Sequence, residues 1–315
     1  MADIESFLRQ RASELAPTAG QLQAAARSHA YLRDTLSTGK MECRIQTDYL
    51  SGSYARQTAI RPLDDVDVVF EIDASQWKRN LWQRLLEQLP TPTAVIETFA
   101  RAVRYRYPHS SVRKQRRSVG LVLEHLQIDV VPAVVDEERP EWLRIPDVTS
   151  GSWIATAPRV HADLAARVNS NTGGLFKPLV RLLKGWNAGL ASTAQFKSFA
   201  VETLAARLFS GIRLDSLTQG LHAMCDFAAW RGGHPAAMAW RDACGVDLSY
   251  WNGNVPDLAG TGSNVVAGAD SDRRARFTQA ARIMRDAIAG ASAARTQESA
   301  WGHVEPRLRA GMSRL

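Results

Sequence analysis

The feature that most constrains this chain is a Gly-Ser pair followed by two aspartates in a strand-like run. Gly52 and Ser53 end one strand-like segment and begin a short helix, and Asp65-Val66-Asp67 follows eleven residues later. Glycine lets the backbone approach a ligand closely, and the N–H groups at a helix start suit a phosphate. Side chains alternate across a strand, so Asp65 and Asp67 share one face while Val66 faces the core.

A third aspartate lies in the run Leu126–Val131, whose apolar residues alternate so that Asp129 points to the opposite face. If this strand lies beside the one carrying Asp65 and Asp67, three carboxylates converge. Neighbouring carboxylates repel unless a cation or a proton separates them, and Mg²⁺ prefers oxygen ligands. We therefore predict that all three are catalytic, metal-ligating residues for two Mg²⁺ ions, with Mn²⁺ as the alternative ion.

Residues 175–190 are typical of an amphipathic helix with a basic stripe. Lys177, Arg181 and Lys184 are spaced i, i+4 and i+7, on the side opposite the leucines. Like charges at this spacing repel unless an anion neutralises them. The stripe is either a solvated face or a phosphate contact, and the predicted metal site favours the second. Ser198 is predicted to be the N-cap of the next helix.

The pattern GS-x11-DVDV followed by IDV resembles the nucleotidyltransferase superfamily with a polymerase-β-like catalytic lobe. Its members use Mg²⁺ to transfer a nucleotide from an NTP onto a hydroxyl and release pyrophosphate. The segments KPLVRLLKGWN and FKSFAVETL extend the resemblance to the bacterial cGAS/DncV-like nucleotidyltransferases (CD-NTases), over about Leu50 to Val266. The resemblance implies metal binding by Asp65, Asp67 and Asp129, donor-phosphate contacts by Gly52 and Ser53, a triphosphate grip by Lys184 and Ser198, and base stacking on Phe199.

The secondary-structure pattern predicts an α+β protein of two domains. Residues 1–160 are expected to form an N-terminal helix and the catalytic lobe, a polymerase-β-like core in which helices flank a mixed sheet. Residues 161–315 are expected to form a helical lobe that completes the nucleotide-binding cleft. Strands are predicted at 44–50, 66–71, 119–124 and 126–131, helices at 1–36 (broken at 17–20), 76–89 and 93–105, and loops around Pro140, Pro146 and Pro158.

Charge is unevenly distributed along the chain. There are 39 Lys+Arg against 32 Asp+Glu, a formal net charge of +7, and residues 101–117 hold seven of the cations with no acid. Such clusters favour a polyanionic partner. The stripe on 175–190 suits a triphosphate, whereas the 101–117 cluster suits an acceptor nucleotide or a regulatory polyanion, and the sequence does not choose between them.

The sequence shows no membrane-spanning run, no secretory signal and no disulfide framework. No run approaches the ~18–20 apolar residues that span a bilayer, and the N-terminal residues include early acids and no apolar stretch. The three cysteines, Cys43, Cys225 and Cys244, are too few and too scattered for a disulfide framework. We expect a cytoplasmic protein with no membrane partner.

The expected function is the joining of NTPs into a cyclic di- or trinucleotide second messenger, with pyrophosphate release. In the family such a product activates an effector protein in antiphage signalling. A linear transferase that tails RNA or nucleotidylates a small molecule or protein is the alternative, and an inactive nucleotide- or RNA-binding module is a third. The sequence leaves open the bases, linkage, ring size, oligomeric state and any gating by a protein or RNA.

Overall fold

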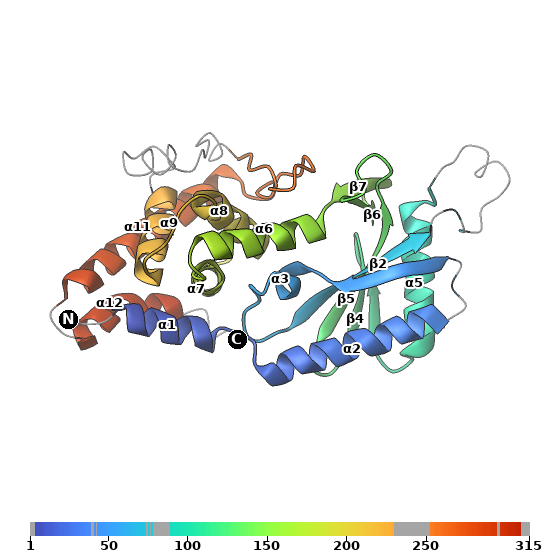
Figure 1. Cartoon of the computed structure of the whole chain (residues 1–315), viewed down its shortest axis with the longest axis horizontal. Coiled ribbons are helices and arrows are strands. Elements are labelled where there is room, and N and C mark those ends of the chain that lie inside the picture. Colours follow the sequence, from blue (N-terminus) through green and yellow to red (C-terminus); the bar gives the residue numbers. More distant parts are fainter. Residues whose placement is uncertain are drawn as a thin grey trace. The chain divides into compact units, whose positions relative to one another are not determined.

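The computed structural model describes residues 4–38, 41, 43–73, 75, 77, 89–229, 253–294 and 297–309. The chain forms two compact units (Figure 1). The helical unit comprises Met1–Pro17, Gln57–Pro62 and His161–Leu315, and the sheet unit comprises Thr18–Arg56 and Leu63–Val160. Each unit is described by itself below.

The sheet unit is built on a mixed seven-stranded sheet with the order β1-β2-β5-β4-β3, to which β6 adds by pairing with β5 and β7. Among the strands that the structure describes, β2 and β5 are the only parallel pair; the other pairs are antiparallel. The strands are β1 (Arg44–Leu50), β2 (Asp65–Asp73), β3 (Ser111–Lys114), β4 (Val119–Val122), β5 (Gln127–Val135), β6 (Leu143–Asp147) and β7 (Ser152–Thr156).

The alternation predicted for the two central strands is present. In β2, Val66 and Val68 are buried while Asp65 is exposed and Asp67 only partly buried; in β5, Ile128 is buried beside a partly buried Asp129. The apolar face packs against helix α5 (Pro92–Arg106), whose Phe99 is fully buried and lies 6.2 Å from the Phe70 ring, centroid to centroid. The opposite face of the two strands therefore carries the acids.

Two helices accompany this sheet in Figure 1, α2 (Ala19–Thr38) and α5. Thr91 caps α5 by accepting a hydrogen bond from the Ala94 N–H at 3.3 Å, and Pro92 occupies the first turn, where proline is tolerated. The helix predicted over 76–89 falls mostly outside the described residues. Strands β3, β6 and β7 lie in stretches for which the sequence predicted no strand.

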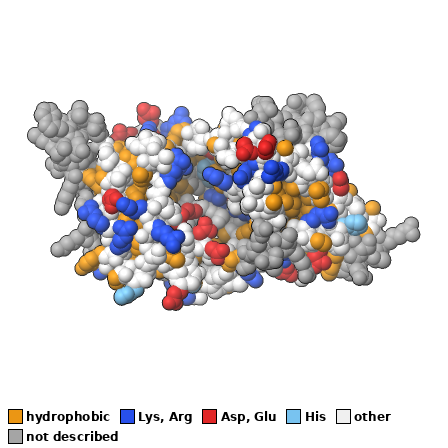
Figure 2. All heavy atoms as spheres, turned by 180° about the vertical axis from the view of Figure 1, so that it is seen from behind, with side chains coloured by type: hydrophobic (Ala, Val, Ile, Leu, Met, Phe, Trp, Pro, Cys, Tyr) orange, Lys and Arg blue, Asp and Glu red, His pale blue; other side chains and the backbone are white. Residues whose placement is uncertain are grey.

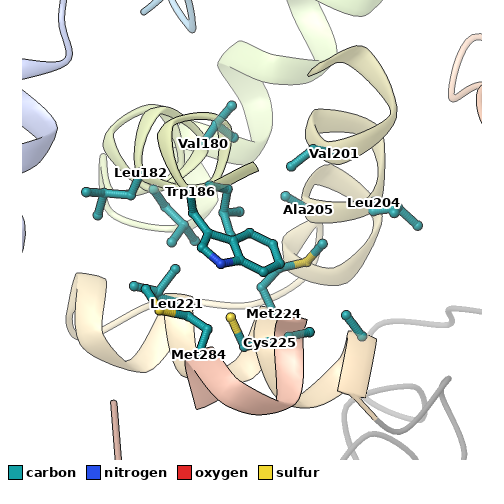
Figure 3. Packing of buried hydrophobic residues seen from close by; sticks show 14 of the residues in the cluster. Val180, Leu182, Trp186, Val201, Leu204, Ala205, Leu221, Met224, Cys225 and Met284 are labelled. Carbon is teal, nitrogen blue, oxygen red and sulfur yellow. The ribbon is translucent and has the colours of Figure 1, made fainter. Parts of the chain in front are cut away.

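The helical unit is a bundle around one apolar core. Its helices are α1 (Ile4–Glu14), α6 (Pro158–Asn171), which begins in the sheet unit, α7 (Phe176–Gly189), α8 (Ser198–Phe209), α9 (Leu217–Ala229), α11 (Ser271–Ala293) and α12 (Gln297–Arg309). Figure 3 shows the Trp186 ring of α7 lying between side chains of α8 and α9. The mixed sheet and the helical second unit confirm the predicted α+β class.

Two segments of the predicted first domain pack with the helical unit. In α1, Phe7 and Leu8 belong to the helical core, and the Glu5 carboxylate accepts hydrogen bonds from the N–H groups of Leu217 and Thr218, at 3.1 and 2.9 Å. The segment 57–62 joins this end of the chain, because the Arg61 N–H donates to the Leu15 carbonyl at 2.7 Å. The sheet unit is therefore smaller than the predicted 1–160 domain.

Cys43 and Cys225 are buried free thiols, and Cys225 lies in the helical core. Cys244 lies outside the described residues. No helix in the described part of the chain is both long enough and apolar enough to cross a membrane.

Candidate active site

Strand pairing brings the predicted carboxylates of the sheet unit together. In the parallel pair of β2 and β5, Asp67 lies directly opposite Asp129, and Asp65 lies opposite Gln127. Directly opposed residues on neighbouring strands have side chains close enough to interact. The strand pairing on which the predicted convergence depended is therefore present in the fold.

The Gly-Ser turn lies against the same carboxylates. Helix α3 (Gly52–Ala55) is a single turn that follows β1, and the Ser51 N–H donates to the Asp67 carbonyl at 2.8 Å. Gly52 has a φ of +63°, and a Cβ added there would collide with the Asp67 carboxylate. Glycine is thus required twice at this position, for its backbone conformation and for the room that the carboxylate occupies.

The crowding of the acids perturbs their protonation. Burial, together with the negative charges of Asp129 and Asp65, raises the pKa of Asp67 to about 6. Burial also raises the pKa of Asp129, against two amide hydrogen bonds that lower it. A carboxylate with a raised pKa is one whose negative charge lacks compensation. This face of the sheet therefore favours an added positive charge.

The structure does not itself arrange a metal-ligand cluster. Across the described ranges, no three His, Cys, Asp or Glu side chains form a group ready to hold a metal ion. The observations that bear on a cation are the in-register aspartates and the raised pKa of Asp67.

Two residues that the sequence did not single out hold Asp129. The side-chain amides of Gln115 and Gln127 donate to Asp129 Oδ1 at 3.1 and 3.2 Å. Gln127 was visible as the i−2 neighbour of Asp129 on its strand, so alternation alone placed it on the acidic face. Gln115 gave no such signal, because it comes from the turn between β3 and β4.

In the helical unit, Lys184 is not part of an exposed stripe. Its side chain is only 3% exposed, and its ammonium pairs with Glu202 Oε2 at 2.8 Å and donates to the carbonyl and hydroxyl oxygens of Thr58. Thr58 in turn donates to Glu202 at 2.8 Å. Of the two alternatives for the stripe, a solvated face therefore does not describe Lys184, because a buried charge requires a partner of this kind; its triphosphate contact stays a prediction.

The other two cations of the predicted stripe reach the same segment. Lys177 Nζ donates to Gln57 Oε1 at 2.9 Å, and Arg181 donates to the Gln57 carbonyl at 3.1 Å. Gln57 has a positive φ of 58°, which is uncommon outside glycine. The three basic residues of α7 therefore fasten the segment that directly follows helix α3 and Arg56.

Ser198 and Phe199 open helix α8. Ser198 is exposed and is the first helical residue, while Lys197 occupies the N-cap position, so the predicted cap is displaced by one residue. The Phe199 ring is partly buried and meets the His161 ring edge-on, with centroids 5.1 Å apart. Asp257, buried in the loop 253–268, approaches His161 Nε2 at 3.4 Å.

Much of the basic cluster 101–117 has partners within the sheet unit. Arg116 and Arg117 both pair with the buried Asp147, at 2.8 and 2.9 Å, and Lys114 pairs with Glu97. The hydrogen bonds from Arg116 chiefly hold the pKa of Asp147 far below its ordinary value. On the face drawn in Figure 2, Lys and Arg side chains form separate groups interspersed with acids rather than one continuous basic surface.

Comparison with known proteins identifies the family. Residues 1–169 match the Second Messenger Oligonucleotide or Dinucleotide Synthetase domain, abbreviated SMODS. A cyclic AMP-AMP-AMP synthase from Acinetobacter sp. is 29% identical over 205 residues, which are 62% of this chain and 55% of that protein. The chain thus spans about half the length of the curated relatives it matches.

The fold likeness extends over nearly the whole chain. A solved structure of E. coli MS115-1 CdnC with ATP aligns with a TM-score of 0.71 at 21% identity, covering 97% of each chain. The CdnC chain of its complex with HORMA-deltaN aligns with a TM-score of 0.70 at 22% identity, covering 97% of this chain and 96% of that one. Taken with the SMODS match over more than half of its residues, this chain belongs to the Second Messenger Oligonucleotide or Dinucleotide Synthetase family, the bacterial CD-NTases.

Proposed function

We propose that this chain is a Mg²⁺-dependent nucleotidyltransferase that joins NTPs into a cyclic di- or trinucleotide second messenger. The observation that carries the proposal is the register of Asp67 with Asp129, beside a glycine turn that has no room for a side chain. Family membership supports the same reaction. ATP and GTP complexes of similar folds support NTPs as the substrate class.

The acidic face fits a hard divalent cation. Its carboxylate oxygens are the ligands that Mg²⁺ prefers, and burial with the charges of Asp129 and Asp65 raises the pKa of Asp67, which a bound cation would offset. Asp65, Asp67 and Asp129 would hold two Mg²⁺ ions, or Mn²⁺ in their place. When bound, such ions neutralise charge on the reacting phosphate and lower the pKa of an attacking hydroxyl.

The chain's own residues position the reactants. Backbone N–H groups of Gly52 and Ser53 would bind donor phosphates, and Gly52 lets the phosphates approach the backbone. In the reaction, a ribose hydroxyl oxygen bonds to the α-phosphorus of an NTP, the bond to the β-phosphate oxygen breaks, and pyrophosphate leaves. The hydroxyl proton passes to a carboxylate or to water. A second transfer of the same kind closes the ring.

Roles for the helical unit belong to the same proposal. Ser198 is exposed at the start of α8 and would bind phosphate oxygens, and Phe199 would stack on a nucleobase. A phosphate contact by Lys184 would have to share its ammonium with Glu202 and Thr58. We propose further that the reaction occurs in the cytoplasm and that the product activates an effector in antiphage signalling. The complex of E. coli CdnC with HORMA-deltaN supports a regulatory protein partner as part of this proposal, with a regulatory RNA as the alternative.

The test is incubation of the purified protein with α-labelled NTPs and Mg²⁺. We expect pyrophosphate and a phosphatase-resistant product from the wild type, and neither from Asp67→Asn. Asp64→Asn is the matched control, because Asp64 is an exposed neighbour that precedes β2. A linear, phosphatase-sensitive product would support the alternative transferase, and no turnover with any NTP or partner would contradict the enzymatic proposal.

A further inference from the structure

The turn between β3 and β4 delivers a side chain to the proposed metal ligand Asp129. Gln115 Nε2 donates to Asp129 Oδ1 at 3.1 Å, and the Ser118 hydroxyl donates to Gln115 Oε1 at 2.5 Å. The Gln115 N–H also donates to the Ser118 carbonyl at 2.9 Å. Because the hydroxyl engages the amide oxygen, the amide nitrogen is the end that faces the carboxylate.

Gly120 and Gln127 are both compatible with the hydrogen bond from Gln115 to Asp129. Gly120 lies directly opposite Asp129 on the antiparallel strand β4. A Cβ at Gly120 would approach Gln115 Nε2 to 2.7 Å, so a larger residue would displace the amide. Gln127 donates to the same oxygen, Oδ1, at 3.2 Å. Both amides thus restrain one oxygen of the carboxylate.

The turn is itself anchored to a second hairpin. Asp147, 1% exposed by side chain, receives Arg116 and Arg117 from the turn and the N–H groups of Thr149 and Ser150 from its own loop. The Val148 N–H donates to the Arg116 carbonyl at 3.0 Å. Bidentate and charge-assisted contacts to a buried acid hold geometry well. The two arginines therefore fix the turn that carries Gln115.

We propose that Gln115 is a positioning residue for the nucleotidyltransfer reaction, and that Arg116, Arg117 and Asp147 hold it in place. By holding Oδ1 of Asp129, Gln115 and Gln127 would leave its other oxygen available to a cation that Asp65, Asp67 and Asp129 would hold. This inference rests on the proposed function. It also gives part of the 101–117 cluster a structural role, because Arg116 and Arg117 hold the turn from which Gln115 contacts Asp129.

The test measures metal binding as well as turnover in the full chain. Mn²⁺ affinity without NTP is read from the electron paramagnetic resonance signal of the free ion, and turnover from pyrophosphate release. Gln115→Leu removes the donor at similar length, and we expect roughly a 10- to 100-fold weaker Mn²⁺ affinity. Excess Mg²⁺ should restore its turnover, whereas Asp129→Asn should stay inactive. Gln46→Leu is the matched control, because it makes the same substitution at an exposed position of β1 beside Glu71 and Ile72, away from Asp67 and Asp129, and it should match the wild type.

Wild-type Mn²⁺ affinity in folded Gln115→Leu overturns the proposal, and so does a loss that excess Mg²⁺ does not repair. If Gln115→Leu does not fold, Ser118→Ala keeps the glutamine and removes its orienting hydroxyl. We then expect ~5-fold weaker Mn²⁺ binding from the loss of one hydrogen bond, and unchanged binding again overturns the proposal. A further outcome is that the wild type makes no nucleotide product while Gln115→Leu still binds Mn²⁺ more weakly than the wild type. That result would retain the positioning role and reject the proposed reaction.

Discussion

Gly52→Ala should disable the site through the Asp67 carboxylate rather than through the backbone. The substitution has two separable effects: it places a residue with a side chain at a φ of +63°, and it places a Cβ where the Asp67 carboxylate lies. Gly151→Ala is the matched control. Gly151 also has a positive φ, of +67°, but a Cβ there would meet nothing within 4 Å.

The magnitudes of the two effects differ. A left-handed conformation costs an alanine roughly 1–2 kcal/mol, so both variants should lose about that much unfolding free energy. Only Gly52→Ala must also move a proposed catalytic carboxylate. A shift of ~1 Å at a reacting group lowers the rate ~10²-fold, so we expect at least that loss of turnover for Gly52→Ala and none for Gly151→Ala.

Three measurements separate the possible causes. Urea unfolding gives the loss of stability, pyrophosphate release gives turnover, and Mn²⁺ titration without NTP reports on the carboxylates alone. Weakened Mn²⁺ binding distinguishes a displaced Asp67 from a mere obstruction of donor phosphates. Turnover and Mn²⁺ affinity equal to those of Gly151→Ala would refute the reasoning, because the Asp67 carboxylate would not then occupy the space beside Gly52.

Three further outcomes follow from buried groups. Lys184→Met should lower the unfolding free energy by ~3–5 kcal/mol because it leaves the buried Glu202 carboxylate without its partner. The double variant Lys184→Met with Glu202→Leu should recover most of that loss, and equal urea midpoints for the two variants would contradict this. The KM for NTP of the double variant tests the triphosphate role. Because the pKa of Asp67 is raised to about 6 in the folded state, its charge destabilises the metal-free protein above that pH, and the penalty fades as the pH falls toward the ordinary aspartate pKa of 3.8. The thermal midpoint of Asp67→Asn should lack this component between those limits, and a profile parallel to the wild type would contradict it. Leu8→Ala, at a fully buried position of α1, should cost ~2–5 kcal/mol, and an unchanged midpoint would show that α1 does not pack in the helical core.

The central strands were predictable because local alternation and burial agree there. Strand β1 begins and ends at the predicted residues, and the acids of β2 and β5 lie on the predicted face. Such segments need no knowledge of distant residues, since a period of two with buried valines determines the face. The sequence did not show which strands are neighbours, so the parallel pairing that places Asp67 opposite Asp129 could be recognised only in the structure.

Strand β6 was missed because proline signals a loop. Pro146 lies inside β6, which the sequence assigned to a loop-rich stretch. The pairing of β6 with β5 covers only Arg144 and Leu143, so Pro146 has no ladder bond to donate to β5. Proline is therefore tolerated in β6, because its position does not require an N–H donor toward β5.

Positive charge was the signal that the sequence resolved least, and the reason is electrostatic. A sequence does not show which acid lies beside a cation, so Lys184 and Arg117 were both assigned only to an external anion. In the fold, Lys184 lies against Glu202 and Arg117 against Asp147, both buried acids that lie on other elements of the same unit. The raised pKa of Asp67, by contrast, shows a negative charge that the fold leaves under-compensated. The group with the under-compensated charge is therefore a carboxylate, and this supports the proposed binding of a cation at Asp67.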